Sequence, residues 1–186
     1  MNKILIGLVG LYLTLQSCSA GKMDTKEYLI PEGHNYSKQW LRDVRFSSKT
    51  IEFDFKPDST WLYEDYDFSF GNKIYGITGI NPRKYSCRLT WRSVNNQLFI
   101  GFLVHADDLT RSEVICKKPI DGSWYHCTIK DTGNFFKVYF DDYYIGIQKK
   151  ERRWLVYRAL PYFGTERNGI VIKAPHEIKV KINDNS

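Results

Sequence analysis

The sequence predicts an all-β protein, and three observations lead to that fold class. Short segments alternate between apolar and polar residues, with the period of two that places one side of a strand on a core. Aromatic residues, which suit pleated and half-buried surfaces, make up 16% of the chain. No stretch keeps a helical period over three turns. Many short strands separated by turn residues predict an antiparallel β-sandwich or a barrel.

The clearest predicted strands lie between residues 50 and 105. In segment 50–56 the apolar residues Ile51, Phe53 and Phe55 alternate with polar ones. Segment 84–92 repeats this pattern, and its polar side is made of Ser86, Arg88, Thr90 and Arg92. Segment 97–105 follows Asn95-Asn96 and is apolar on both sides, which is typical of a strand inside the sandwich rather than at its edge.

Further strands are predicted for the remainder of the chain. Their ranges are 123–130, 135–140, 143–149, 154–157, 169–173 and 177–182. Asp141-Asp142 is a two-residue loop suited to a hairpin. The basic cluster 149–153 lies between two strand-like segments, which predicts a solvated turn. Because there is no internal repeat and no linker, we expect one domain.

The N-terminus has the pattern of a bacterial export signal. Lys3 gives a positive start, and an apolar run from Ile4 to Leu15 is too short to span a bilayer comfortably. Leu15-Gln16-Ser17-Cys18 resembles a lipobox, in which the cysteine is acylated and becomes the first residue. The alternative is an ordinary signal peptide that is cut after Ala20. The apolar run stops directly before Cys18, which favours the lipoprotein interpretation.

This interpretation divides the chain into a signal peptide (1–17), a lipidated tether (18–27) and a β-sandwich domain (28–186). Two or three acyl chains hold a protein stably at a membrane, so we expect a palmitate-type lipid anchor on Cys18. Ser19 follows the cysteine where retained lipoproteins carry Asp. By resemblance to sorted Gram-negative lipoproteins, this predicts an outer-membrane location, without settling which face of the membrane the domain occupies.

The net charge indicates which classes of binding partner the protein favours. The net charge of +6 falls to +5 once Lys3 is removed, which favours contact with anionic glycans or lipid headgroups, while export argues against nucleic acid.

If Cys18 is lipidated, Cys87, Cys116 and Cys127 remain, and they permit one disulfide with one thiol left over. Cys116 and Cys127 flank a Pro-Ile-Asp-Gly turn and could face each other across a hairpin. Equally, all three could be small buried residues.

Three segments together resemble a known superfamily. Asn72-Lys73-Ile74-Tyr75-Gly76-Ile77 leads into Ser86-Cys87-Arg88-Leu89-Thr90-Trp91-Arg92, and Pro161-Tyr162-Phe163-Gly164 precedes Ala174-Pro175-His176-Glu177-Ile178. The set is similar to exported bacterial domains with the concanavalin A-like lectin/glucanase jelly roll. The resemblance covers most of residues 28 to 183 and concerns the fold. It implies two curved antiparallel sheets and carbohydrate as the ligand class, whereas function itself needs a site.

The sequence contains few patterns that are typical of catalytic sites. Jelly-roll glucanases carry three acidic residues on one strand, but here Glu52 and Asp54 are followed on the same side by Lys56, which indicates the polar side of an ordinary strand. The four histidines lack zinc-ligand spacing, so no metal or cofactor is expected. Some lyases on this fold use His, Tyr and Arg together, and Tyr125, His126 and Arg88 are candidates for such a set. An enzyme is therefore the second hypothesis rather than the first.

Residues suited to sugar binding are easier to find. A sugar ring stacks on Trp or Tyr while Arg takes its hydroxyl groups. Trp61 follows the Pro57-Asp58-Ser59-Thr60 turn, so it could be exposed on a loop. Tyr75, Arg88 and Arg92 lie on or beside the central strands, and each of the four could equally be structural. We therefore expect a non-catalytic carbohydrate-binding lipoprotein. The alternatives are a glycoside hydrolase or polysaccharide lyase, and a structural lipoprotein that docks an envelope protein.

Overall fold

A computed structural model describes residues 25–39, 45–64, 71–149, 153, 155–164, 166–167 and 170–186 of this chain. Cys18, the predicted signal peptide and most of the predicted tether lie outside the described residues. Over the described part, helix is limited to one short 3-10 turn, η1 (Ser59–Trp61), and the remaining elements are strands. No helix in this part is long and apolar enough to cross a membrane.

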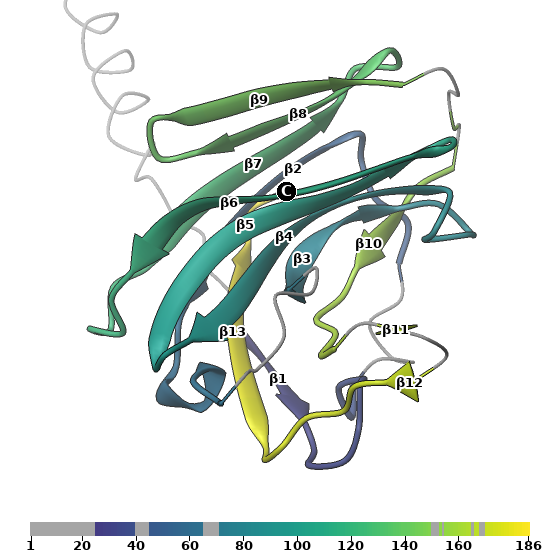
Figure 1. The fold of residues 1–186 in the computed structure, drawn as a ribbon. Coiled ribbons are helices and arrows are strands. Elements are labelled where there is room, and N and C mark those ends of the chain that lie inside the picture. The colour runs from purple at the N-terminus through teal and green to yellow at the C-terminus, as the bar shows by residue number, and fades with distance from the viewer. Residues whose placement is uncertain are drawn as a thin grey trace, which may run out of the picture.

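The strands form two main antiparallel sheets (Figure 1). The six-stranded sheet runs in the order β1 (Thr25–Ile30), β13 (Ile178–Asp184), β2 (Thr50–Lys56), β7 (Tyr125–Asp131), β8 (Phe135–Phe140), β9 (Tyr143–Gln148). The five-stranded sheet runs in the order β10 (Tyr157–Ala159), β3 (Asn72–Thr78), β4 (Tyr85–Val94), β5 (Gln97–Ala106), β6 (Leu109–Lys118). A small third sheet pairs β11 (Glu166–Arg167) with β12 (Ile170–Val171). The predicted all-β, two-sheet jelly roll is confirmed.

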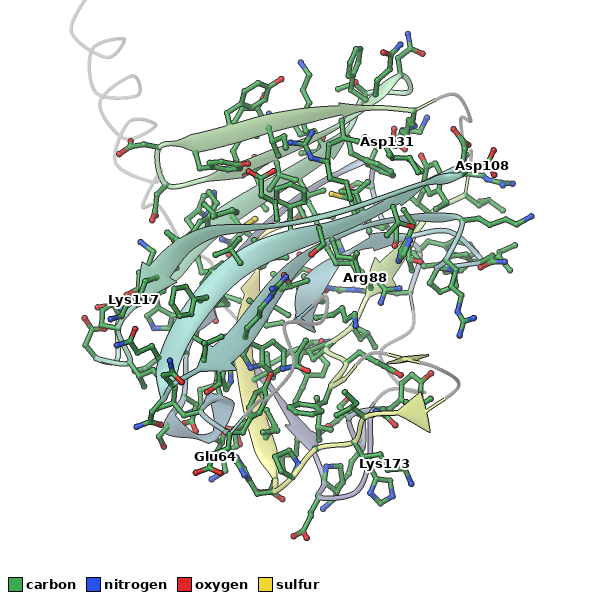
Figure 2. The ribbon with its side chains drawn as sticks, viewed as in Figure 1. Glu64, Arg88, Asp108, Lys117, Asp131 and Lys173 are labelled. Atoms are coloured by element: carbon green, nitrogen blue, oxygen red, sulfur yellow. The ribbon has the colours of Figure 1, made fainter. Side chains whose placement is uncertain are left out.

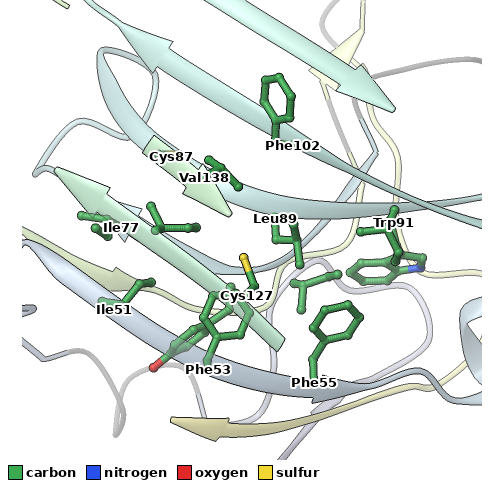
Figure 3. Close-up of a cluster of buried hydrophobic side chains, with 14 of the residues drawn as sticks. Ile51, Phe53, Phe55, Ile77, Cys87, Leu89, Trp91, Phe102, Cys127 and Val138 are labelled. Carbon is green, nitrogen blue, oxygen red and sulfur yellow. The ribbon is translucent and has the colours of Figure 1, made fainter. Parts of the chain in front are cut away.

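The core lies between the two main sheets and is rich in aromatic rings (Figure 3). Phe53 and Phe55 come from β2, and Leu89 and Trp91 come from β4, and all four are fully buried. Each such side chain contributes about 1.5–3 kcal/mol when it leaves water. The alternation that predicted these strands is therefore the pattern that fills the core.

Two expectations about individual strands are confirmed. β5 lies between β4 and β6, inside its sheet, as its apolar sides predicted. The hairpin of β8 and β9 turns at Asp141-Asp142, where Asp141 adopts a φ of 49°.

β1 begins at Thr25, so the last part of the predicted tether belongs to the sheet instead. β6 was not predicted at all.

Two other expectations need correction. Cys116 lies on β6 and Cys127 on β7, and because these strands belong to different sheets, no hairpin brings the two thiols together. Cys87, Cys116 and Cys127 are all free. Lys149, expected in a solvated turn, is buried instead, and its Nζ lies 2.9 Å from Asp131 Oδ1.

Candidate functional site

The polar side of the five-stranded sheet, facing away from the core, is the candidate site, and we call it the outer face. Directly paired residues in a sheet point to the same side, and residues two apart on one strand do so as well. Arg88 on β4 pairs with Gly76 on β3 and with Leu103 on β5. Thr90 pairs with Lys73, and Ser86 pairs with His105. The registers therefore put Lys73, Arg88 and His105 on one face.

These three basic residues form a diagonal row across β3, β4 and β5, which we call the cationic line. Lys73 lies opposite Thr90, two positions from Arg88 in one direction. His105 lies opposite Ser86, two positions from Arg88 in the other direction. Neighbouring strands are about 4.8 Å apart and successive residues about 3.3 Å, so the row extends about 10 Å across the sheet and about 13 Å along the strands, with Arg88 at its midpoint.

Arg88, labelled on β4 in Figure 2, is the centre of the cationic line. Its Nε atom is out of reach of solvent and has no hydrogen-bond partner. Burial lowers the pKa of this guanidinium to about 10. Among the described residues, no carboxylate forms an ion pair with Arg88 or with Lys73. A buried guanidinium nitrogen without a hydrogen-bond partner is costly, and a group perturbed in this way is a candidate for binding an anion.

Lys73 reaches the outer face because of a β-bulge. The register of β3 against β4 shifts between Lys73 and Tyr75, so these two side chains point to opposite sides of the sheet. Lys73 Nζ donates to the Gly164 carbonyl at 2.5 Å and lies 5.2 Å from the centre of the Tyr162 ring. Burial, with a smaller effect of Arg88, lowers the pKa of Lys73 to about 7. At neutral pH its amine is therefore divided between charged and neutral forms.

His105 ends the cationic line on β5. Its Nδ1 lies 2.9 Å from Thr110 Oγ1 on β6. Burial lowers the pKa of His105 to about 4, and the charges of Arg88, Lys73 and Arg83 act in the same direction. The imidazole is therefore neutral at pH 7 and can accept or donate a hydrogen bond there.

The surroundings of the line contain apolar as well as polar side chains, since the buried Leu103 pairs directly with Arg88. Arg92 reaches across β5 and donates to Ser112 Oγ on β6 at 3.3 Å. Gly76, beside Arg88, has no room for a side chain, because a Cβ there would lie 2.2 Å from the Cys87 carbonyl oxygen. Nothing on β3 therefore covers Arg88 from that side. The predicted ligand contacts Arg88 and Arg92 do lie on the outer face.

The other two predicted ligand contacts lie elsewhere. Trp61 is fully buried rather than exposed on a loop, because η1 turns its ring onto Trp91, 4.7 Å between centroids, and Nε1 donates to the Lys179 carbonyl at 2.6 Å. Tyr75 points into the core, and its hydroxyl donates to Asp184 at 2.8 Å. Both side chains are therefore buried, and neither is exposed on the outer face.

The lyase-like set from the sequence is not assembled either. His126 lies on the solvent side of the six-stranded sheet, where Nδ1 is 2.7 Å from Asp54 Oδ1, while Arg88 belongs to the other sheet. Tyr125 packs against Phe55. The basic residues that actually accompany Arg88, namely Lys73 and His105, share no sequence motif. Only the pairing of β3, β4 and β5 brings them together.

No arrangement typical of a metal centre is found in the described part of the chain. No three His, Cys, Asp or Glu side chains are grouped there as a metal ion would need. The outer face instead offers a fixed guanidinium, an amine with a lowered pKa and a neutral imidazole. Such a set can neutralise an anion and can accept a proton.

Comparisons with known proteins concern the fold. No family model and no curated protein sequence matches this chain. Among solved structures, an alginate lyase from Alteromonas sp. 272 is similar with a TM-score of 0.49 and 11% identity, over 86% of this chain and 84% of that one. A glycoside hydrolase family 16 endo-glucanase from Bacteroides ovatus gives a TM-score of 0.47 and 10% identity, over 84% and 78%. The CBM40 of a Ruminococcus gnavus sialidase, bound to sialyllactose, gives 0.37 and 13%, over 85% and 90%.

Proposed function

We infer that this protein binds an acidic polysaccharide on the outer face of its five-stranded sheet. The observation that carries this proposal is Arg88, whose buried Nε has no partner and whose neighbours on the cationic line are also basic. A carboxylate accepts two parallel hydrogen bonds from a guanidinium, which is the geometry that Arg88 offers. The ligand would therefore supply the missing negative charge.

The remainder of the outer face suits a sugar chain. Thr110 on β6 pairs with His105 and carries an exposed hydroxyl group on this face, whereas Ser86 and Thr90 point to the same side but are buried. Arg92 and Ser112 add further polar atoms along β4 and β6. A uronic acid carries both a carboxylate and several hydroxyl groups on one ring, so it matches a face that mixes cations with hydroxyls.

The test compares two single-charge variants. Arg88→Met removes the charge but keeps a long side chain, and Lys137→Gln removes one charge from the solvent side of the other sheet, on β8. Binding to polygalacturonate and polymannuronate is measured by affinity electrophoresis and titration calorimetry. We expect Arg88→Met to lose at least ten-fold in affinity and Lys137→Gln to bind normally.

The melting temperature of Arg88→Met shows whether a loss of binding comes from a lost site or from an unfolded protein. Because Nε of Arg88 has no partner, Arg88→Met should keep or raise the melting temperature. If Arg88→Met binds both polymers as well as the unchanged protein does, then the outer face is not the site. If Arg88→Met and Lys137→Gln lose affinity to the same extent, then the polymers bind through the net charge of the protein and not through a site at Arg88.

A second candidate function is β-elimination by a polysaccharide lyase. Two bases on the cationic line favour it, since His105 is neutral at pH 7 and Lys73 is partly neutral. In this reaction Arg88 would neutralise the uronate carboxylate. One of the bases would take the adjacent ring proton as the glycosidic oxygen leaves. Elimination leaves a carbon–carbon double bond conjugated with the carboxylate, so ultraviolet absorbance that grows with time on polyuronate would reveal it.

The lipid anchor remains a proposal. Its support is the sequence pattern at Leu15-Gln16-Ser17-Cys18. Acyl chains on Cys18 would hold the sandwich at a membrane, in our proposal the outer membrane, and would keep the glycan-binding face near the cell envelope.

A further inference from the structure

A group of aromatic residues borders the outer face at its β10 edge, and we call it the aromatic ledge. It consists of Tyr36, Phe46, Tyr157 and Tyr162. Phe46 pairs with Tyr157 in an isolated bridge, and Tyr157 pairs with Thr78 on β3. Tyr36 pairs with Tyr162, which in turn pairs with Lys73. Because directly paired residues point to the same side of a sheet, both aromatic pairs lie on the same face as the cationic line.

The ledge is exposed, unlike the aromatic core. Phe46 is 67% exposed and Tyr36 is 52% exposed. Each ring is nevertheless held by a partner. Phe46 stacks on Tyr157 with 5.2 Å between centroids, and Tyr36 meets Tyr162 edge-on at 4.9 Å. Rings that are both exposed and fixed lose little side-chain entropy when a ligand covers them.

The ledge and the cationic line are continuous. Tyr162 lies under the Lys73 amine, 5.2 Å from ring centre to Nζ. From β10 to β4 is two strand spacings, about 10 Å. One sugar ring is too short to cover both the ledge and Arg88, so an occupant of both must be a chain of rings.

We propose that the aromatic ledge is a second subsite, in which a sugar ring of the same acidic chain stacks while another ring gives its carboxylate to Arg88. This rests on the proposed function and adds to it the form of the ligand, an oligosaccharide or polymer rather than a single acidic sugar or a small anion. The C–H face of a sugar packs on an aromatic ring, which needs no charge. The ledge therefore provides affinity that grows with chain length.

A length series tests the ledge separately from the cationic line. Galacturonate oligomers of one to five rings are titrated into the protein, into Phe46→Ala and into Tyr36→Ala. Tyr144→Ala is the matched control, because Tyr144 is also an exposed aromatic residue but belongs to β9 of the other sheet. Phe46→Trp keeps a stacking ring, so it should retain binding, which also guards against a variant that fails to fold.

The expected result is a gain in affinity of at least ten-fold between the shortest oligomer that binds and the pentamer. Phe46→Ala and Tyr36→Ala should lose most of this gain while binding the short oligomer normally, and Tyr144→Ala should behave as the unchanged protein. If the unchanged protein shows the gain and both ledge variants keep it, the ledge proposal alone is overturned. If no oligomer binds to the unchanged protein, the proposed function fails first. A dimer that Phe46→Ala dissociates would also overturn the proposal, because a second copy would then cover the ledge.

Discussion

The residues of the cationic line make binding depend on pH. Lys73 has a pKa of about 7 in the free protein, and a bound carboxylate favours its charged form. Binding should therefore take up a proton, and affinity should fall as the pH rises from 6 to 9. His105 has a pKa of about 4 and Arg88 one of about 10, so neither should change charge substantially over most of this range.

Calorimetry in buffers of different ionisation heat measures this proton uptake. Lys73→Met should bind more weakly and show no pH dependence near 7. Proton uptake that persists unchanged in Lys73→Met would show that another group is responsible.

The lowered pKa of Lys73 also predicts how the free energy of unfolding changes with pH. The unfolded chain takes up a proton on Lys73 below about 10.5, so its contribution to the free energy of unfolding falls as the pH drops toward 7.

Unlike Lys73 and Arg88, the buried Lys149 has a carboxylate partner, Asp131, and this ion pair stabilises the fold. Asp131 accepts hydrogen bonds from Tyr85 and from the Gly133 amide, and its Oδ1 lies 2.9 Å from Lys149 Nζ (Figure 2). Both charged side chains are essentially inaccessible to solvent. The partners hold the pKa of Asp131 low although its burial acts against this.

Lys149→Met should lower the free energy of unfolding by about 3 kcal/mol, because it leaves a buried carboxylate without its cation. Urea denaturation measures the loss. The double variant Lys149→Met/Asp131→Leu should recover much of it, since it removes both charges. A single variant as stable as the unchanged protein would mean that the pair is dispensable.

At the scale of the elements, the contact of β3 with β4 positions the site. Gly76 lies against β4 so closely that a Cβ would be 2.2 Å from the Cys87 carbonyl oxygen and 2.7 Å from Arg88 Cα. Gly76→Ala should therefore push β3 away, lower the free energy of unfolding by about 2 kcal/mol and weaken polyuronate binding.

Gly146→Ala is the matched control for this prediction. Gly146 also lies within a strand, β9, but its added Cβ would meet only the Tyr144 side chain, with the hydroxyl 2.9 Å away, and that side chain can move. We expect it to cost less than about 1 kcal/mol and to leave binding unchanged. Chemical denaturation of both variants, followed by polyuronate titration, decides the matter. Equal stability of the two would contradict the close contact of β3 and β4.

The sequence predicted elements well where one side of a strand is buried and the other is polar. β2 and β4 have this alternation, and their predicted ranges are close to those observed. β6 was missed because it is an edge strand whose residues are mostly polar or charged. β1 begins with Thr25-Lys26-Glu27, which looks like a tether until the pairing with β13 is known.

The candidate site could be predicted only in part. Arg88 and Arg92 were identified because they share the polar side of a clearly alternating strand. Lys73 was not, because the bulge after it reverses the side on which Tyr75 would be expected, and a bulge leaves no reliable mark in sequence. The sequence also suggested that Trp61 is exposed on a loop. Its burial could not be predicted, since only tertiary packing shows that η1 turns its ring inward.

At the scale of the whole molecule, the two sheets have different roles. On its solvent side the six-stranded sheet carries the ion pair of Lys181 with Glu27 and the hydrogen bond between His126 and Asp54. The five-stranded sheet carries the cationic line with no carboxylate paired to Lys73 or Arg88 among the described residues. The two sheets therefore differ in how their basic groups are partnered, and the five-stranded sheet has positive charge to offer a ligand.

The most direct test of this account is calorimetric titration of the purified protein with two forms of one polymer, polygalacturonate and the same polymer after chemical reduction of its carboxylates to alcohols. Both forms keep their length, linkage and remaining hydroxyl groups, so they differ only in the group at one carbon of each ring, which is a carboxylate in one form and a hydroxymethyl group in the other. We predict saturable binding of the acidic form that weakens with salt, and at least ten-fold weaker binding of the reduced form. Equal binding of the two forms, or binding of the reduced form alone, would contradict the assignment of the outer face to an acidic glycan.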